Sequence, residues 1–516
     1  MASRDAEKWP TAEPGRSGRT LDPARAVTIG STSVGATVYE GAQLLMAETD
    51  DGYDQRLQVL EEEAKKLGWT VSRTPLAPGL SVVEIASAPD EVSEPPDAWR
   101  LLQHARLANR GSLPGVALDH LMASPEANPV EISHPVEISH PVEISHPVEI
   151  SHPAATYGTP GSGGRQPVAV VGGPPTRRES VPGRRPVVAL LDTGVAWHPW
   201  LRGVVESDVR GVDGEQIGYP HTVSFAPGTK DTEETLDGTL APLQGHGTFI
   251  AGIIRQVSPD ADIVSWRIVP DRGPIKESDW IKALHQILAL VRQGVEDAEQ
   301  GRADGRGRGR LIDVLSLSMG YYHESNEDAL FDEILRPLME EFGRLGVMVV
   351  CSVGNDATDR PSYPAAFAPW TAESGAAVHH PDRCRTHKDV VPVVSVAANN
   401  PNLRTGALFS NVGCWVRVWA PGAAVVSTMP RRNGGLLPLA RDDKYGVERE
   451  CIDPDDFTGR FAVWSGTSFA APHVGAQLAK ALQEQFRVHG VDDRRAARVK
   501  RGWDVVTAVT GIAQVP

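Results

Sequence analysis

The sequence has few of the residues that stabilise disulfide-rich proteins and none of the segments that mark membrane proteins. Four of its 516 residues are cysteines, too few for a disulfide-built scaffold. No apolar run approaches the roughly 18 uninterrupted residues of a membrane helix. The polar, Pro- and Gly-rich N-terminal stretch lacks the apolar core of a signal peptide. We therefore expect a soluble cytoplasmic protein, with no membrane partner and with reduced thiols.

An excess of basic residues is also missing. The 51 lysines and arginines are outnumbered by 66 aspartates and glutamates, so the formal net charge is −15 at pH 7. An acidic surface is not drawn to nucleic acid or to anionic membranes, and we expect neither as a partner. The chain is nevertheless long enough for a large enzyme core and an additional module.

The N-terminal part of the sequence divides into two segments. Residues 1–36 are polar and show no apolar periodicity, which predicts a disordered segment. Residues 37–123 predict a compact α+β module with the order strand, helix, strand, strand, helix, strand. These elements are expected at residues 41–49, 54–68, 69–76, 80–87, 97–109 and 116–122. Their order is that of a small ferredoxin-like unit.

A tandem repeat follows the module. The hexapeptide Pro-Val-Glu-Ile-Ser-His occurs four times between Pro129 and His152. A proline at every sixth position prevents a helix and keeps the chain extended. The regular histidines suit a metal-binding tract, but a solvated linker is the simpler interpretation. We assign residues 124–185 to this linker because the chain stays rich in Pro, Gly and Arg.

Residues 186–516 alternate between continuous apolar runs and helical patterns. The run from Pro186 to Asp192, PVVALLD, is typical of a strand buried on both faces. The alternation predicts a parallel α/β sheet with right-handed crossovers, whose functional groups lie beyond the carboxyl ends of the strands. A long helix is expected to begin near Ser278 and to be capped by that serine.

Two polar residues end strands of this sheet. Asp192 lies in LLDTG, and an aspartic protease would need a second motif of this kind, which the sequence does not contain. Asp192 alone can also be a turn residue before Gly194. Asn355, in CSVGN, can offer an amide donor to an oxyanion, or it can be an ordinary asparagine at a strand end.

His246 and Ser468 lie at the starts of two predicted helices. His246 is flanked by glycines in GHGTFIAGII, which allow backbone or substrate to approach closely. Ser468 lies in SGTSFAAPHVG, whose proline is tolerated in a first helical turn. Each residue alone has a structural interpretation, as a packed histidine or a helix cap. The N-terminus of a helix also suits a nucleophile, because its dipole and free N–H groups stabilise a developing oxyanion.

Together these residues form the set that nucleophilic hydrolysis needs. Serine is a poor nucleophile until a base takes its proton, and histidine titrates in the required range. A carboxylate then orients the imidazole and stabilises its protonated form. The chain order Asp192, His246, Ser468 is one of the known orders of such a triad.

From Pro186 to the C-terminus, the sequence resembles the subtilisin-like (S8) serine peptidase family. The matching motifs are LLDTGVAWHPWL, GHGTFIAGII, LSLSMG, CSVGN, SYPAAF, FSNVG with WAPG, and SGTSFAAPHVG. The resemblance implies a doubly wound α/β sandwich with a mostly parallel central sheet. It implies that Asp192 orients the base and that His246 is the general base and acid. Ser468 would be the nucleophile, and Asn355 would be the side-chain oxyanion donor.

The resemblance also implies a polypeptide substrate that docks as an added strand. The residues that would bind it are Ser318, Met319 and Gly320 along that strand, and Ser352, Val353 and Gly354 around the first specificity pocket. His198 and His473 are expected to be structural.

Some features depart from the family pattern. Residues 371–390 and 431–460 look like insertions that shape or cover the cleft. The chemistry requires no cofactor. Members of the family often bind structural calcium, but no full ligand set can be mapped here. The acidic loop at residues 231–237 is better explained as a solvated surface loop than as a calcium site.

The module of residues 37–123 resembles the inhibitory propeptide of the same family in its element order, size and position. In that interpretation, its last strand near His120 to Met122 enters the active site and is cut there. The alternative is a regulatory domain that stays attached.

The leading hypothesis for the whole chain is thus a serine endopeptidase that forms an acyl-enzyme and processes itself. The alternative function is that of a catalytically quiet binding or scaffold protein with a peptidase fold.

Overall fold

The computed structural model describes the chain in thirteen stretches. They are residues 18–24, 26, 34–48, 52–89, 92–122, 164–207, 209–220, 240–270, 275–302, 308–324, 334–371, 386–435 and 437–514. The hexapeptide repeats, the acidic loop at 231–237 and residues 372–385 of the first expected insertion lie outside these stretches.

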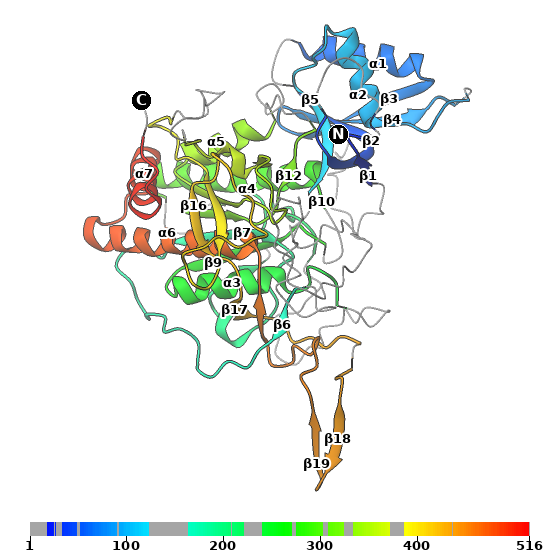
Figure 1. Cartoon of the computed structure of the whole chain (residues 1–516). Coiled ribbons are helices and arrows are strands. Elements are labelled where there is room, and N and C mark those ends of the chain that lie inside the picture. The colour runs from blue at the N-terminus through cyan, green and yellow to red at the C-terminus, as the bar shows by residue number, and fades with distance from the viewer. Residues whose placement is uncertain are drawn as a thin grey trace.

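A seven-stranded parallel sheet forms the centre of the molecule (Figure 1). Its strands run in the order β16-β15-β13-β11-β7-β9-β8, and every neighbouring pair is parallel. Their bounds are β7 Val187–Asp192, β8 Val205–Ser207, β9 Asp262–Arg267, β11 Val314–Leu317, β13 Met348–Ser352, β15 Val394–Asn399 and β16 Val418–Pro421. All six residues of β7 are buried, as expected for a strand covered on both faces.

Helices cover both faces of this sheet. The helices are α3 His246–Val257, α4 Glu277–Glu299, α5 Leu335–Arg344, α6 Thr467–His489 and α7 Arg495–Thr510. Alternate residues of β7 separate two cores: Ala189 and Leu191 pack with α4 and α5, whereas Val188 and Leu190 pack with α3, α6 and α7. Because successive side chains of a strand point to opposite faces, this division shows a sheet with helices on both sides.

The N-terminal module is a separate α+β unit at one end of the molecule (Figure 1). Its elements are β1 Gly18–Leu21, β2 Thr37–Ala47, α1 Tyr53–Lys66, β3 Trp69–Ala77, β4 Leu80–Ser87, α2 Ala98–Ala108 and β5 Val116–Met122. Its strands pair antiparallel in the order β5-β2-β4-β3, and β1 pairs with β2. The prediction of disorder for residues 1–36 was wrong for β1. Pairing with β2 of the same chain orders this segment, although its own apolar pattern is weak.

The module docks through strand pairing on the region that contains the central sheet. The two-residue strand β10, Ile275–Lys276, extends the module's sheet antiparallel to β5, with Ile275 opposite Met122. Immediately after β10, Ser278 donates its backbone N–H and its hydroxyl to the Asp119 carboxylate at 2.9 and 2.7 Å. The expectation that Ser278 itself caps α4 was therefore wrong: Asp119 of the module supplies the acceptor for this first turn.

Residues 164–185 belong to the region that contains the central sheet, which corrects the expectation of a linker reaching residue 185. The strand β6, Gln166–Pro167, pairs antiparallel with β20, Phe461–Trp464, which also pairs with β17, Val425–Thr428. Further along the segment, Arg184 binds the carboxylates of Asp313 and Asp493 at 2.6–2.8 Å. Composition suggested a linker because the polar contacts that order this segment come from residues remote in sequence.

The second expected insertion, 431–460, contains a projecting hairpin. Its strands are β18, Arg441–Lys444, and β19, Val447–Glu450, and every residue of both is exposed (Figure 1). The remaining elements are short: β12 Tyr321–Tyr322, β14 Ser362–Tyr363, and the 3₁₀ turns Pro199–Leu201 and Ala365–Phe367.

Candidate active site

Asp192 and His246 meet at the carboxyl end of the central sheet. Asp192 is the last residue of β7, and His246 is the first residue of α3. The Nδ1 atom of His246 lies 2.9 Å from both carboxylate oxygens of Asp192, and both side chains are buried. The same carboxylate accepts the backbone N–H of Thr193 at 2.7 Å, which holds it in place. This contact fixes the imidazole with its Nε2 edge turned away from Asp192.

The glycines around His246 have identifiable roles. Gly245 has a φ of 86°, a left-handed conformation that side chains rarely adopt, and it sets the turn into α3. A Cβ atom on Gly247 would lie too close to the carbonyl oxygen of Gly194 and 3.0 Å from an Asp192 carboxylate oxygen. The Gly-His-Gly sequence thus permits α3 to start directly against the end of β7.

Ser468 is the second residue of α6 and is fully buried. Its hydroxyl donates to the carbonyl oxygen of Ser318 at 3.4 Å, and the Ser318 hydroxyl donates to the carbonyl oxygen of Ser468 at 3.1 Å. The next residue, Phe469, packs its ring 5.4 Å from the His246 ring. Ser468 therefore lies at a helix N-terminus. The next residue packs on the His246 ring, and Ser468 itself contacts Ser318, which follows β11.

Asn355 follows β13 and is anchored by Thr467. Its Oδ1 atom accepts the backbone N–H of Thr467 at 2.8 Å and the Thr467 hydroxyl at 2.9 Å. Because the side-chain oxygen is occupied in this way, the amide nitrogen is the end that can donate elsewhere. Thr467 was not identified from the sequence, although it lies next to Ser468 in the same motif; its hydroxyl contact with Asn355 spans 112 residues.

Aromatic rings enclose the imidazole. Trp464 meets the His246 ring edge-on, with centroids 5.6 Å apart and an interplanar angle of 86°. Phe249 of α3 packs against both Trp464 and Phe469. His246 is only 1% exposed. The rings exclude water from one side of His246 and restrict its rotation, which favours a single orientation of the ring.

The two predicted substrate-binding segments follow neighbouring parallel strands. Ser318–Gly320 continues from β11 and Ser352–Gly354 continues from β13. The second segment is held by Asn411, whose side-chain amide donates to the Val353 carbonyl oxygen at 2.8 Å. Gly354 has a φ of 105°, so a side chain there would strain the backbone.

The two histidines that were expected to be structural lie in packed surroundings. His198 Nδ1 accepts the backbone N–H of Trp200 at 3.0 Å, and its Nε2 lies 3.2 Å from the Arg460 carbonyl oxygen. Burial lowers the pKa of His198 to about 4, which keeps it neutral. His473, within α6, has a pKa lowered by burial and lies 3.2 Å from the side chain of Gln477.

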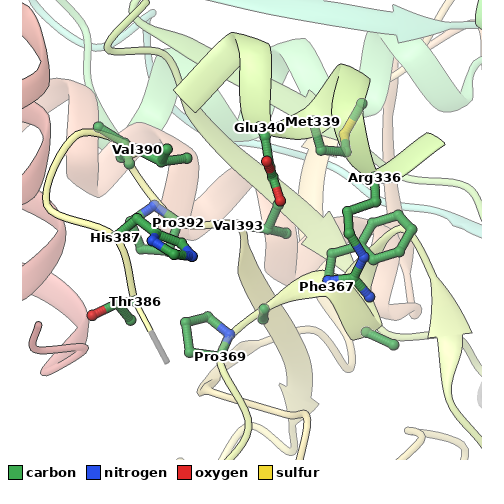
Figure 2. Close-up of a pocket in the computed structure, with 13 residues that line it drawn as sticks. Arg336, Met339, Glu340, Phe367, Pro369, Thr386, His387, Val390, Pro392 and Val393 are labelled. Carbon is green, nitrogen blue, oxygen red and sulfur yellow. The ribbon is translucent and has the colours of Figure 1, made fainter. Parts of the chain in front are cut away.

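The described residues also contain a cavity away from the candidate triad. Within these residues, no group of three or more His, Cys, Asp or Glu could hold a metal ion, and no helix is long and apolar enough to cross a membrane. A cavity of about 100 Å³ lies between α5 and the segments 366–369 and 386–393, with Arg336, Glu340 and His387 among the residues that line it (Figure 2). None of the candidate catalytic residues lines this cavity.

Several known proteins are similar in sequence to this region. The family model of the subtilase family matches residues 183–497. The major intracellular serine protease of Bacillus subtilis (strain 168) is 24% identical over 335 residues, which cover 62% of this chain and 75% of the relative. Subtilisin BL of Lederbergia lenta is 24% identical over 317 residues, which cover 61% and 83% of the two chains.

Solved structures give more distant matches. A lanthipeptide protease is 20% identical, with a TM-score of 0.38 over 62% of this chain and 79% of its own. Fervidolysin from Fervidobacterium pennivorans, a keratinolytic enzyme related to subtilisin, is 17% identical, with a TM-score of 0.44 over 92% and 60%. The family model covers more than half of the sequence, and the protein therefore belongs to the subtilase family and is a serine endopeptidase.

Proposed function

We propose that Asp192, His246 and Ser468 form the catalytic triad of this endopeptidase. The observation that carries the proposal is the pair of 2.9 Å contacts from His246 Nδ1 to Asp192, formed where α3 and α6 both begin. Asp192 keeps the proton on Nδ1, so Nε2 is the atom that accepts the Ser468 proton. Ser468 is the nucleophile because its hydroxyl lies at a helix N-terminus, where negative charge is stabilised.

The reaction proceeds through an acyl-enzyme. Ser468 Oγ attacks the scissile carbonyl carbon while its proton passes to His246 Nε2, and the carbonyl oxygen becomes an oxyanion. The Asn355 side-chain amide and the Ser468 backbone N–H donate to that oxyanion. The C–N bond breaks as His246 returns the proton to the leaving amine. Water, deprotonated by His246, then hydrolyses the ester and restores Ser468.

The substrate is a polypeptide in an extended conformation. Ser318, Met319 and Gly320 offer backbone groups to an added strand, and Ser352, Val353 and Gly354 line the first specificity pocket. The support is their placement after neighbouring parallel strands, with Ser318 in hydrogen-bond contact with Ser468.

We further propose that residues 37–123 are a ferredoxin-like, propeptide-like inhibitor of the same chain. The support is the antiparallel order β5-β2-β4-β3 and the docking of β5 on β10. His120 near the end of β5 stacks on Tyr321, with ring centroids 4.4 Å apart, and Tyr321 directly follows the proposed substrate strand. The last strand of the module thus lies beside the residue that follows the proposed substrate strand, and self-processing would separate the two parts.

We also propose that the enzyme works inside the cell, as the names of two similar proteins, the intracellular serine proteases of Bacillus subtilis and Paenibacillus polymyxa, state for those enzymes. Cell fractionation followed by detection of the chain tests this location.

Labelling with an organophosphonate probe tests the triad. The probe is expected to attach to Ser468 in the wild type, and mass spectrometry of the labelled peptide identifies the residue. Ser468→Ala should take up no label, and His246→Ala should label far more slowly while remaining folded. A folded, processed wild type that takes up no label would support the catalytically quiet scaffold instead.

Intact mass tests self-processing separately. Wild type should lose an N-terminal fragment that contains the module, whereas Ser468→Ala should stay at full length. If wild type and Ser468→Ala both stay at full length while the wild type still takes up the probe, the module is a permanent regulatory domain.

A further inference from the structure

We infer that Arg165 is a positioning residue for His246, so that the segment just upstream of the peptidase region is part of the active-site support. This inference rests on the proposed role of His246 as the general base. Arg165 lies 81 positions before His246 in the sequence, in a stretch whose composition gave no indication of a function.

Arg165 holds the backbone that leads into His246. The Arg165 side chain is 1% exposed and is among the largest fully buried side chains of the described residues. Its Nη1 atom donates to the carbonyl oxygens of Gln244 and Pro242 at 2.9 and 3.1 Å, and its Nη2 atom donates to that of Ala241 at 2.7 Å. These three carbonyls precede the Gly245 turn and His246. The two nitrogens of one guanidinium therefore hold the backbone segment that leads into α3.

Arg165 also packs on the ring that faces His246. Its guanidinium carbon lies 5.1 Å from the centroid of Trp464 and 6.0 Å from that of Phe457. Trp464 in turn lies 5.6 Å from the His246 ring, edge-on. The indole of Trp464 thus packs against both the guanidinium and the imidazole, and Arg165 contacts both the backbone before His246 and the side chain beside it.

Strand pairing keeps Arg165 in this place. The next two residues, Gln166 and Pro167, form β6 and pair with Val463 and Ala462 of β20. Val168 then donates its backbone N–H to the Phe461 carbonyl oxygen at 3.3 Å. β20 ends at Trp464, four positions before Ser468. The pairing therefore also links this segment to the backbone that leads to the proposed nucleophile.

Loss of the guanidinium would leave the buried carbonyl oxygens of Ala241 and Gln244, and the part-buried one of Pro242, without this donor, and it would leave a gap behind Trp464. Buried polar groups without partners are costly, so the segment 241–244 would shift until its carbonyls found other donors. A shift of that segment rotates or displaces the imidazole, and small displacements of a catalytic base reduce turnover strongly. Lysine can donate to one or two of these carbonyls but cannot reproduce the fork or its stacking on Trp464.

The position of Arg165 also limits maturation. If the chain is cut between the module and the peptidase region, an active product must keep Arg165, so the cut that yields the active enzyme falls before residue 165. A product that begins after Arg165 would lack the support of His246 even though Asp192, His246 and Ser468 are all present.

The test compares Arg165→Met and Arg165→Lys with a matched control in the full-length chain. The control is Arg177→Met, because Arg177 belongs to the same segment and also donates to backbone. It donates to the Ala261 carbonyl oxygen at 2.6 Å and to the carboxylate of Asp262, the first residue of β9. Active sites are counted by organophosphonate labelling, and kcat and KM are measured per labelled site on a peptide substrate, together with the pH dependence of kcat/KM.

For Arg165→Met we expect kcat per labelled site to fall by about tenfold to a hundredfold, with little change in KM. The acid limb of the pH profile should move to higher pH by a few tenths of a unit, because a buried cation near the imidazole is gone. Arg165→Lys should lose less turnover and keep the acid limb in place. Arg177→Met should match wild type in all three quantities.

Two results would overturn the inference. In the first, Arg165→Met lowers only the number of labelled sites and leaves kcat per site and the pH profile unchanged, which is the result of a purely structural residue. In the second, an active product of natural processing begins after Arg165. If wild type itself takes up no label, the proposed triad fails, which is a different outcome from either of these.

Discussion

His120 Nδ1 lies 2.6 Å from Glu277 Oε2, and this contact joins the N-terminal module to the first turn of α4. The opposite ring nitrogen of His120 lies 3.0 Å from Glu324 Oε2, and Glu324 also contacts Arg106 and His323. All five side chains are buried. The module is therefore docked through a buried group of charges, at the edge where β5 pairs with β10.

The docking is expected to weaken as the pH rises. Burial opposes the charge on His120, but Glu277 and Glu324 outweigh it and raise the pKa of His120 to about 10. Burial raises the pKa of the neighbouring Asp119 to about 7, despite the hydrogen bonds from Ser278. Both pKa values are raised in the docked state, so both groups stabilise docking at low pH and lose this contribution as the pH rises, Asp119 through 7 and His120 from 6.5 towards 10.

Amide hydrogen exchange of full-length Ser468→Ala measures this effect. The protection factors of the β5 and β10 amides should fall by up to about tenfold per pH unit between pH 7 and 9, because one proton is released on undocking in that range. His120→Gln should flatten the slope. Amides of β11 in the central sheet serve as the control and should keep their protection; an equal loss in β11 would indicate global unfolding instead.

Asn355→Leu should reduce turnover while leaving substrate binding nearly unchanged. In the proposed mechanism, the amide nitrogen of Asn355 donates to the oxyanion only after the substrate carbonyl has been attacked, so loss of this amide should raise the barrier without weakening the ground-state complex. We expect kcat to fall by about 10²–10³. Asn400→Leu is the control, because Asn400 is an exposed turn asparagine bonded to Thr405 and Gly406. A comparable rise in KM would contradict the oxyanion role.

Gly247→Ala should impair the Asp192–His246 contact. Its new Cβ atom would collide with the Gly194 carbonyl oxygen and approach an Asp192 carboxylate oxygen to 3.0 Å. We expect a large loss of kcat per folded molecule. Gly475→Ala is the matched control, because Gly475 is also a helical, buried glycine, but its Cβ would meet only Val314 at an ordinary 3.4 Å. Full activity of Gly247→Ala would mean that α3 can shift without cost to the site.

Asp313→Ala should destabilise the peptidase region strongly. Burial would raise the pKa of Asp313, but Arg184 and Arg498 outweigh it and hold the pKa well below its ordinary value. Removing the carboxylate leaves Arg184 and Arg498 to share Asp493 as their remaining acidic partner, at a cost of about 3–5 kcal/mol in the free energy of unfolding. Denaturant unfolding measures this loss.

The control for Asp313→Ala is Asp492→Ala, which removes the partner of an ion pair to the exposed Arg494 and should change stability by less than about 1 kcal/mol. Because the pKa of Asp313 is depressed, its contribution is present above the ordinary pKa of 3.8 and is lost as the pH falls through the depressed value. The stability difference between wild type and Asp313→Ala should therefore shrink only in strong acid.

Much of the fold and the site could be predicted from the sequence alone. The buried run before Asp192 predicts a strand covered on both faces, because a parallel strand has no solvent-exposed side. The helix that contains Ser468 and the glycines around His246 are local features, which depend on residues close together in the sequence. The elements of the N-terminal module could be predicted for the same reason, and their observed bounds lie close to those expected.

Only the tertiary structure decided which distant residues support these elements. Asp119 caps α4 in place of Ser278, Thr467 holds Asn355, and Arg165 reaches the carbonyls before His246. The physical reason is the same in each case: a buried backbone or side-chain group needs a partner, but the partner's position in the sequence is free. Periodicity and motif therefore predict the candidate catalytic residues, whereas the contacts that hold these residues in position became visible only in the folded chain.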